Sequence, residues 1–111
     1  MSNFNQALQI VQGTDETITV QITAGAYTSA DVASASFLMR RRGTTAVSKT
    51  LAGSGITARH DATYIYLDIL LVGVDTASIS GVYEFEVASD IGGTDKRRAA
   101  GHITVLEAGL S

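Results

Sequence analysis

The side chains of this chain that could do chemistry are few and lie far apart in the sequence. The chain holds two histidines, His60 and His102, and no cysteine. A metal site would therefore need both histidines together with a carboxylate such as Asp61, because zinc sites take three or four protein ligands. Serine chemistry is equally unsupported, since no Gly-x-Ser-x-Gly elbow follows a strand and precedes a helix. We predict a protein that is not an enzyme and that holds no metal or cofactor.

Two acidic residues, Asp90 and Asp95, flank the Gly92-Gly93 pair. Calcium sites often draw several oxygen ligands from one loop, which makes this segment a candidate. Asp and Gly also favour tight turns for their backbone conformations alone. We expect a solvated hairpin tip without a metal.

Positive charge is concentrated in two short clusters, Arg40 to Arg42 and Lys96 to Arg98. If their strands flank the strand at 81–89, those two strands run parallel and the clusters lie at opposite ends of the sheet. Arg40 then shares an outer face with Glu84 or Glu86 as an ordinary cross-strand pair. The alternative is contact with an acidic surface on a neighbouring subunit, for which the candidate residues are Arg41, Arg42, Lys96, Arg97 and Arg98.

A third candidate surface comes from the alternation of side chains at 64–71. Tyr64 and Tyr66 fall on the face opposite Ile65, Leu67 and Ile69, so their rings are expected to point outward. Tyr is enriched in interfaces because its ring is apolar and its hydroxyl is polar. A covering strand or loop explains the pattern equally well, so both interpretations stay open.

These side chains must be positioned by β-strands, because polar and apolar residues alternate and no helical spacing is sustained. Turn residues separate the extended runs, which we place at 8–11, 17–23, 35–42, 47–51, 56–60, 64–71, 81–89 and 97–106. A short helical turn is predicted within 74–80, with Asp75 as its N-cap. The sequence therefore predicts an all-β fold, an immunoglobulin-like antiparallel β-sandwich of about seven or eight strands. This single domain covers residues 1–111, with short polar arms at both ends.

Composition narrows the class of protein further. A formal charge of −3 and a pI near 5.1 argue against a nucleic-acid partner, which usually requires a basic excess. The N-terminus lacks the pattern of a signal peptide, and the apolar stretch at 69–72 is too short to span a membrane. A chain without cysteine is compatible with a reducing compartment. We expect synthesis in the cytoplasm and no membrane partner.

The segment at 74–87 is the most specific fold marker. It joins an Asp-Thr-Ala turn to Gly81-Val82-Tyr83, as immunoglobulin-like sandwiches commonly do at their penultimate strand. We expect the Tyr83 hydroxyl to bond to the chain just upstream. Phe85 stands where antibody domains have a cysteine, so apolar contacts with the strand at 17–23 are expected to replace the disulfide.

Several segments together resemble small immunoglobulin-like modules of tailed bacteriophage virions. The segments are Gly13 to Val20, Phe37 to Arg42, Asp75 to Tyr83 and Gly101 to Val105. The pattern is similar to the N-terminal domain of phage baseplate upper proteins and to head decoration proteins. The resemblance implies a structural protein of the virion whose partners are other virion proteins, either the major capsid protein or tail and baseplate proteins. A homo-oligomer is left open.

Among virion roles we expect capsid decoration first, because 111 residues leave no room for the extra domains that baseplate proteins attach to this module. A tail or baseplate component is the second expectation. The alternative from another class is a small adhesion or carbohydrate-binding module on a surface. Such a module would present a row of exposed aromatic residues, for which the chain offers Tyr27, Tyr64 and Tyr66.

Overall fold

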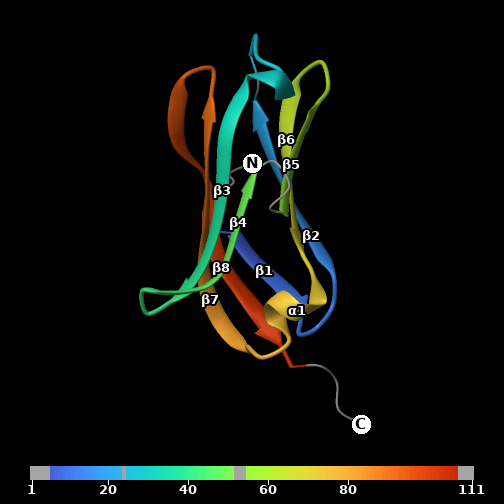
Figure 1. The fold of residues 1–111 in the computed structure, drawn as a ribbon, viewed down its shortest axis with the longest axis vertical. Helices are drawn as coiled ribbons and strands as arrows, with labels where there is room; N and C mark the ends of the chain where they lie inside the picture. The colour runs from blue at the N-terminus through green and yellow to red at the C-terminus, as the bar shows by residue number, and fades with distance from the viewer. Residues whose placement is uncertain (1–5, 24, 52–54, 108–111) are drawn as a thin grey trace.

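The computed structural model describes residues 6–23, 25–51 and 55–107, and most of them lie in β-strands. The strands are β1 (Gln6–Val11), β2 (Glu16–Thr23), β3 (Val32–Arg41), β4 (Thr44–Leu51), β5 (Gly55–His60), β6 (Tyr64–Leu71), β7 (Gly81–Ile91) and β8 (Thr94–Leu106). Two single helical turns, η1 (Ser29–Asp31) and α1 (Gly73–Thr76), lie between strands (Figure 1). The prediction of an all-β chain is confirmed, and each expected run is a strand.

The strands form one mixed sheet in the order β1-β8-β7-β3-β4-β5-β6-β2, which is nearly closed into a barrel. Most neighbours are antiparallel, but β1 runs parallel to β8 and β4 runs parallel to β5. The expectation of a purely antiparallel fold is therefore wrong at two pairings. β1 can pair with β8 in parallel because the chain crosses from one end of the sheet to the other between β1 and β2 instead of forming a hairpin.

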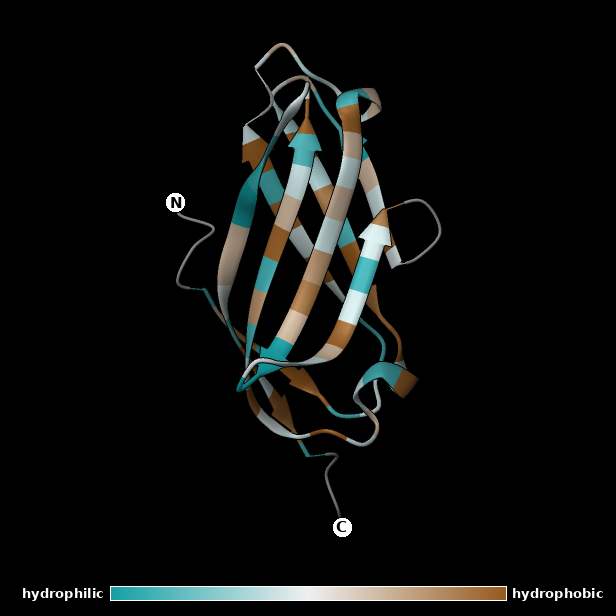
Figure 2. Ribbon diagram, turned by 60° about the vertical axis from the view of Figure 1, so that its left-hand side comes forward, coloured by the Kyte–Doolittle hydropathy of each residue, from teal (hydrophilic) through white to brown (hydrophobic). Residues whose placement is uncertain are grey.

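The core follows from the alternation that the sequence shows. Brown and teal positions alternate along the strands in Figure 2, because successive side chains point to opposite faces of a strand. Fully buried side chains come from five strands and include Phe37, Met39, Ile65, Leu67, Val87 and Ile103. At the centre the Phe37 and Phe85 rings stack with their centroids 6.2 Å apart. Burial of each large side chain is worth about 1.5–3 kcal/mol.

Two tight hairpin turns set the lengths of four strands. Arg42 and Gly43, between β3 and β4, have φ values of 52° and 80°, and Gly92 and Gly93, between β7 and β8, have values of 63° and 90°. Two successive residues with positive φ are typical of a type I′ turn, whose twist matches that of the flanking strands. Because these turns are so short, strand pairing continues to the turn residues, and β4, β7 and β8 extend two or three residues closer to their turns than the sequence predicts.

The predicted helical turn is present as α1, but Asp75 is not its N-cap. The turn begins at Gly73, and the Asp75 carboxylate accepts a hydrogen bond of 2.8 Å from the backbone N–H of Val72. The same carboxylate lies 2.7 Å from Lys49 Nζ, which ties α1 to β4. The expectation was wrong because an acidic residue in the first turn can bond back to the start of a helix as well as precede it. Among the described residues, no helix has the length and apolar character that crossing a membrane requires.

Candidate partner-contact surfaces

The outer face of β6 carries the two tyrosines that the alternation predicts. Ile65 and Leu67 are fully buried, whereas Tyr64 and Tyr66 are half-buried and Leu70 is exposed. The tyrosine rings lie with centroids 6.1 Å apart and planes tilted by 57°. The predicted orientation of these side chains is confirmed.

Strand pairing brings charged side chains against Tyr66. Arg59 of β5 lies opposite Tyr66, and its guanidinium carbon is 4.4 Å from the ring centroid. Arg59 Nε donates to Asp68 Oδ2 at 2.7 Å, and the Thr19 hydroxyl donates to Asp68 Oδ1 at 2.8 Å. The Tyr66 hydroxyl donates to Asp61 Oδ2 at 2.8 Å. We call this set the Tyr66 platform, which comprises Thr19, Arg59, Asp61, Tyr64, Tyr66 and Asp68.

Hydrogen bonding sets the charge state of the platform. Backbone N–H groups of Thr63 and Tyr64, followed by the Tyr66 hydroxyl, hold the pKa of Asp61 below its ordinary value. The hydrogen bond from Arg59 lowers the pKa of Asp68 in the same way, against an opposing effect of burial. The bond to ionised Asp61 raises the pKa of Tyr66. At neutral pH the platform therefore presents two carboxylates, one guanidinium and a neutral phenol in fixed positions.

Arg59 and Asp68 were missed by sequence reasoning, and Asp61 was considered only as a metal ligand. The signal that could have found them is the short turn between β5 and β6. An antiparallel hairpin that pairs His60 with Ile65 necessarily sets Arg59 opposite Tyr66. Alternation within a single strand carries no information about its partner strand, so it does not predict this contact.

Arg41, one of the predicted contact residues, is engaged within its own chain. Its Nη2 donates to the Ser80 carbonyl at 2.7 Å, and its guanidinium carbon lies 4.4 Å from the centroid of the Tyr83 ring. Within the described residues the Tyr83 hydroxyl forms no hydrogen bond with the upstream chain, and Arg41 bonds to the Ser80 and Val82 carbonyls there instead, so the expected tyrosine corner is not formed. Arg41 takes over the corner because β3 ends beside the start of β7 and its guanidinium reaches the Ser80 carbonyl.

The two basic clusters lie toward opposite ends of β7, as predicted. Arg40 is the register partner of Glu84 and Arg97 that of Ala88. Their inner members nevertheless meet at one carboxylate, since Arg40 Nη2 lies 3.6 Å from Glu86 Oε1 and Arg97 Nη1 lies 4.0 Å from Glu86 Oε2. The expected pairing of Arg40 on this outer face is confirmed.

The remaining predicted basic residues differ in their surroundings. Arg42 is exposed in the β3–β4 turn, and Lys96 is exposed near the start of β8. Arg98 is the extra residue at a register shift, and its Nη2 donates to the Thr94 carbonyl at 3.1 Å. Burial lowers the pKa of Arg98, while the neighbouring Asp95 and Asp90 oppose this effect. A partner contact by any of the five basic candidates stays a prediction.

The two histidines lie apart from each other in the fold, whereas Asp90 and Asp95 are neighbours. His60 is at the end of β5, where its Nδ1 is 2.8 Å from the Ser29 hydroxyl oxygen, whereas His102 lies opposite Glu84 in β8. Asp90 and Asp95 are direct register partners, because strand pairing continues to Ile91 and Thr94. They therefore belong to the ladder itself, and the tip is the Gly92-Gly93 turn.

An apolar group that the sequence analysis did not single out lies at one end of the outer face of β1, β8 and β7. Val11 and Leu106 are register partners, and Val82 lies diagonally from Leu106 because its own partner is Thr104. The three side chains of Val11, Val82 and Leu106 are 37%, 54% and 41% exposed. We call them the base patch. Small exposed apolar groups are common, so the patch is a weaker candidate than a larger one would be.

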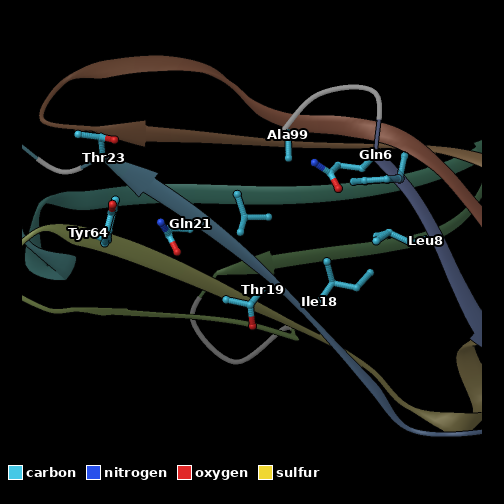
Figure 3. Close-up of a pocket in the computed structure, with 10 residues that line it drawn as sticks. Gln6, Leu8, Ile18, Thr19, Gln21, Thr23, Tyr64 and Ala99 are labelled. Atoms are coloured by element: carbon cyan, nitrogen blue, oxygen red, sulfur yellow. The ribbon is translucent and has the colours of Figure 1, made fainter. Parts of the chain in front are cut away.

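A cavity of about 440 Å³ opens where the two ends of the sheet face each other. Figure 3 shows β2 along one side and β1 with Ala99 of β8 along the other. The lining side chains are uncharged: Gln6, Leu8, Ile18, Thr19, Val20, Gln21, Thr23, Tyr64, Phe85 and Ala99. We call this opening the seam. Its lining contains no carboxylate, imidazole or amine, which is unlike a site built for acid–base chemistry.

The sequence of this chain was compared with protein-family models and with curated proteins. No protein-family model matches its sequence, and no curated protein matches it either.

Proposed function

We propose that this protein is a non-enzymatic structural protein of a tailed bacteriophage virion, with capsid decoration as its first role. The proposal rests on the four sequence segments that resemble phage modules. In the structure these segments lie on β2, on β3, at the corner before β7 and on β8.

We also propose that the fold is an immunoglobulin-like sandwich. Only two residue pairs, Thr50 with Gly55 and Leu51 with Ile56, join β4 to β5. A division at this point leaves one layer of β1, β8, β7, β3 and β4 and another of β5, β6 and β2. Variable-type immunoglobulin domains similarly place their last, penultimate and third strands side by side and add a further strand next to the third.

The observation that carries a binding role is the Tyr66 platform. Its side chains form a surface network on β2, β6 and the β5–β6 hairpin, and two of them, Thr19 and Tyr64, also line the seam. Tyr and Arg are frequent hot spots in protein interfaces, and these two are held in place by Asp61 and Asp68 before any partner arrives. Such preorganisation lowers the entropy lost on binding.

The location of the protein is tested by mass spectrometry of particles from the phage that encodes it. We expect the chain in complete particles and in heads from which the tails have been removed. Recovery with the tail fraction alone would support a baseplate or tail role instead. Absence from both fractions would contradict the virion proposal.

The contact surface is tested with particles that lack the protein and are supplied with purified variants. We expect Tyr66→Ser to weaken particle binding at least ten-fold, as loss of a hot spot does. Tyr27→Ser is the matched control, because Tyr27 is an exposed tyrosine outside the platform. If Leu106→Ser weakens binding and Tyr66→Ser does not, the base patch is the contact surface.

A glycan-binding role is the second candidate, because Tyr64 and Tyr66 are adjacent on one face. Stacking on sugars needs an open aromatic face, and Arg59 covers one side of the Tyr66 ring. This arrangement favours a protein partner. Binding of host cell-wall polysaccharide that Tyr64→Ser abolishes would reverse the preference.

A further inference from the structure

The edge of β2 that faces away from β6 is open to a further strand. β2 is the last strand in the sheet order, and within the described part of the chain it pairs with β6 alone. In an antiparallel pair, every second residue directs its N–H and C=O away from the partner strand. One side of β2 therefore presents a row of backbone donors and acceptors toward the seam.

Beyond its first residue, Glu16, this edge lacks the charges and bulges that usually block strand addition. β2 keeps a single register with β6 from Glu16 to Thr23, and Glu16 at its first position is its one charged residue. The part of β8 that extends beyond its pairing with β1 differs, because it carries Lys96 to Arg98 and a shift of register. Bulges and edge charges are the features by which proteins prevent unwanted pairing. The features that prevent strand addition are therefore found on the β8 side of the seam.

The space beside the β2 edge suits an uncharged chain. Val20, Phe85 and Ala99, which are 4%, 4% and 3% exposed, contribute apolar surface to the seam. None of the lining side chains is charged, so an ionic side chain of an incoming segment would lose water without gaining a counter-ion. An apolar side chain would instead cover surface that water now contacts.

From this geometry we propose that the seam is a docking site for one extended, uncharged segment of a partner protein, which adds to β2 as an edge strand. Alternate side chains of the segment enter the seam beside Ile18 and Val20, and the others lie on the outer face of the sheet. Backbone hydrogen bonds to β2 supply affinity, and the apolar lining selects neutral segments. The inference is independent of the virion role, although Thr19 and Tyr64 belong to both the seam and the Tyr66 platform.

The test uses acetyl-Thr-Val-Ser-Val-Thr-Val-Ser-amide as the probe and the full-length protein. We expect the peptide, added at millimolar concentration, to slow exchange of amide hydrogens in β2 at least ten-fold, as measured by nuclear magnetic resonance. Exchange in β4 should not change. A peptide in which Glu replaces each Val should give no protection. Absence of protection in β2, or equal protection by the Glu peptide, overturns the proposal.

Two N-methylated peptides separate strand addition from unspecific apolar binding. In an added edge strand every second peptide N–H donates to β2, while the others face solvent. Methylation of one alternate set of N–H groups should therefore abolish binding, and methylation of the other set should preserve it. Equal behaviour of the two peptides contradicts the proposal and needs no protein variant.

A variant pair locates the segment in the seam. Ala99→Leu should fill part of the cavity and weaken peptide binding at least ten-fold. Ala100→Leu is the matched control, because Ala100 is the next residue along β8 and does not line the seam. Unchanged binding by a folded Ala99→Leu protein places the peptide elsewhere and overturns the proposal.

Discussion

Tyr66 is the residue at which the aromatic and ionic contacts of the platform meet. Arg59 covers its ring, and Asp61 accepts a hydrogen bond from its hydroxyl group. Asp61 is itself held by the backbone N–H groups of Thr63 and Tyr64. The position of the phenol is therefore set by the β5–β6 turn as well as by strand pairing.

The titration of Tyr66 tests this arrangement. Because Asp61 raises its pKa, Tyr66 should ionise at a higher pH than tyrosine in a peptide, about 10. The folded state favours the neutral phenol, so the stability gained is present below the unfolded pKa and is lost as pH rises through the folded pKa. The measurement is tyrosinate absorbance against pH, with Tyr66→Phe to assign the step.

Asp61→Asn should lower the pKa of Tyr66, since it removes the charge that opposes ionisation. Asp90→Asn is the control, because Asp90 lies on β7 outside the platform. Equal effects of the two variants would show that the hydrogen bond is absent in solution.

Arg41 is the second residue whose contacts can be tested alone. Arg41→Lys should lower the free energy of unfolding by about 1 kcal/mol, because an ammonium cannot both stack on Tyr83 and reach the Ser80 carbonyl. Arg42→Lys, the adjacent exposed arginine, should change it by less than about 0.5 kcal/mol. Urea unfolding of both variants measures the difference, and equal values would contradict the corner described here.

At the scale of elements, β1 depends on a close approach to β8. A side chain at Gly101 would place its Cβ 2.6 Å from the backbone nitrogen of Gln6, the register partner of Gly101. Real Cβ atoms do not come so near to backbone atoms, so the glycine permits the parallel pairing. The alternation of polar and apolar residues along β1 does not by itself reveal that β8 needs a glycine at position 101.

Gly101→Ala should therefore detach the start of β1 and lower the free energy of unfolding by about 2 kcal/mol. Amide hydrogens of Leu8 and Ile10 should exchange faster, while those of β6 keep their rates. Ala100→Ser serves as the control at the neighbouring position. Unaltered exchange in β1 would mean that the two strands do not pair as described.

At the scale of the whole molecule, one core is shared by strands from the entire chain. Phe37 from β3 stacks on Phe85 from β7, and buried residues of β2, β5, β6 and β8 belong to the same cluster. Loss of one central side chain should therefore destabilise the whole fold rather than one strand. Unfolding is expected to be a single cooperative transition.

Phe37→Ala should lower the free energy of unfolding by about 3–5 kcal/mol, because it leaves a cavity in the core. Val74→Ala is the control, since Val74 is 79% exposed and its truncation should cost less than about 0.5 kcal/mol. Circular dichroism and tyrosine fluorescence should report the same transition. Separate transitions would indicate that the two ends of the sheet unfold independently.

Local pattern was sufficient to predict the strands and their faces. The alternation in β6 placed Ile65 and Leu67 in the core and Tyr66 outside, and turn residues marked the approximate strand limits. Both are properties of neighbouring residues in an extended chain. The tight turns at Arg42-Gly43 and Gly92-Gly93 are also local signals, and beside them β4, β7 and β8 begin or end closer to the turn than predicted, whereas β3 ends at Arg41.

Only the tertiary structure decided which strands are neighbours, and so which side chains meet. The parallel pairing of β1 with β8, Arg59 beside Tyr66, and the Arg40 and Arg97 pairs with Glu86 all depend on pairing across the sheet. The seam also depends on the tertiary structure, because it forms between β1 and β2, which are the first and last strands of one sheet. Alternation specifies the face on which a side chain lies, whereas contacts between strands are decided by packing of the whole core.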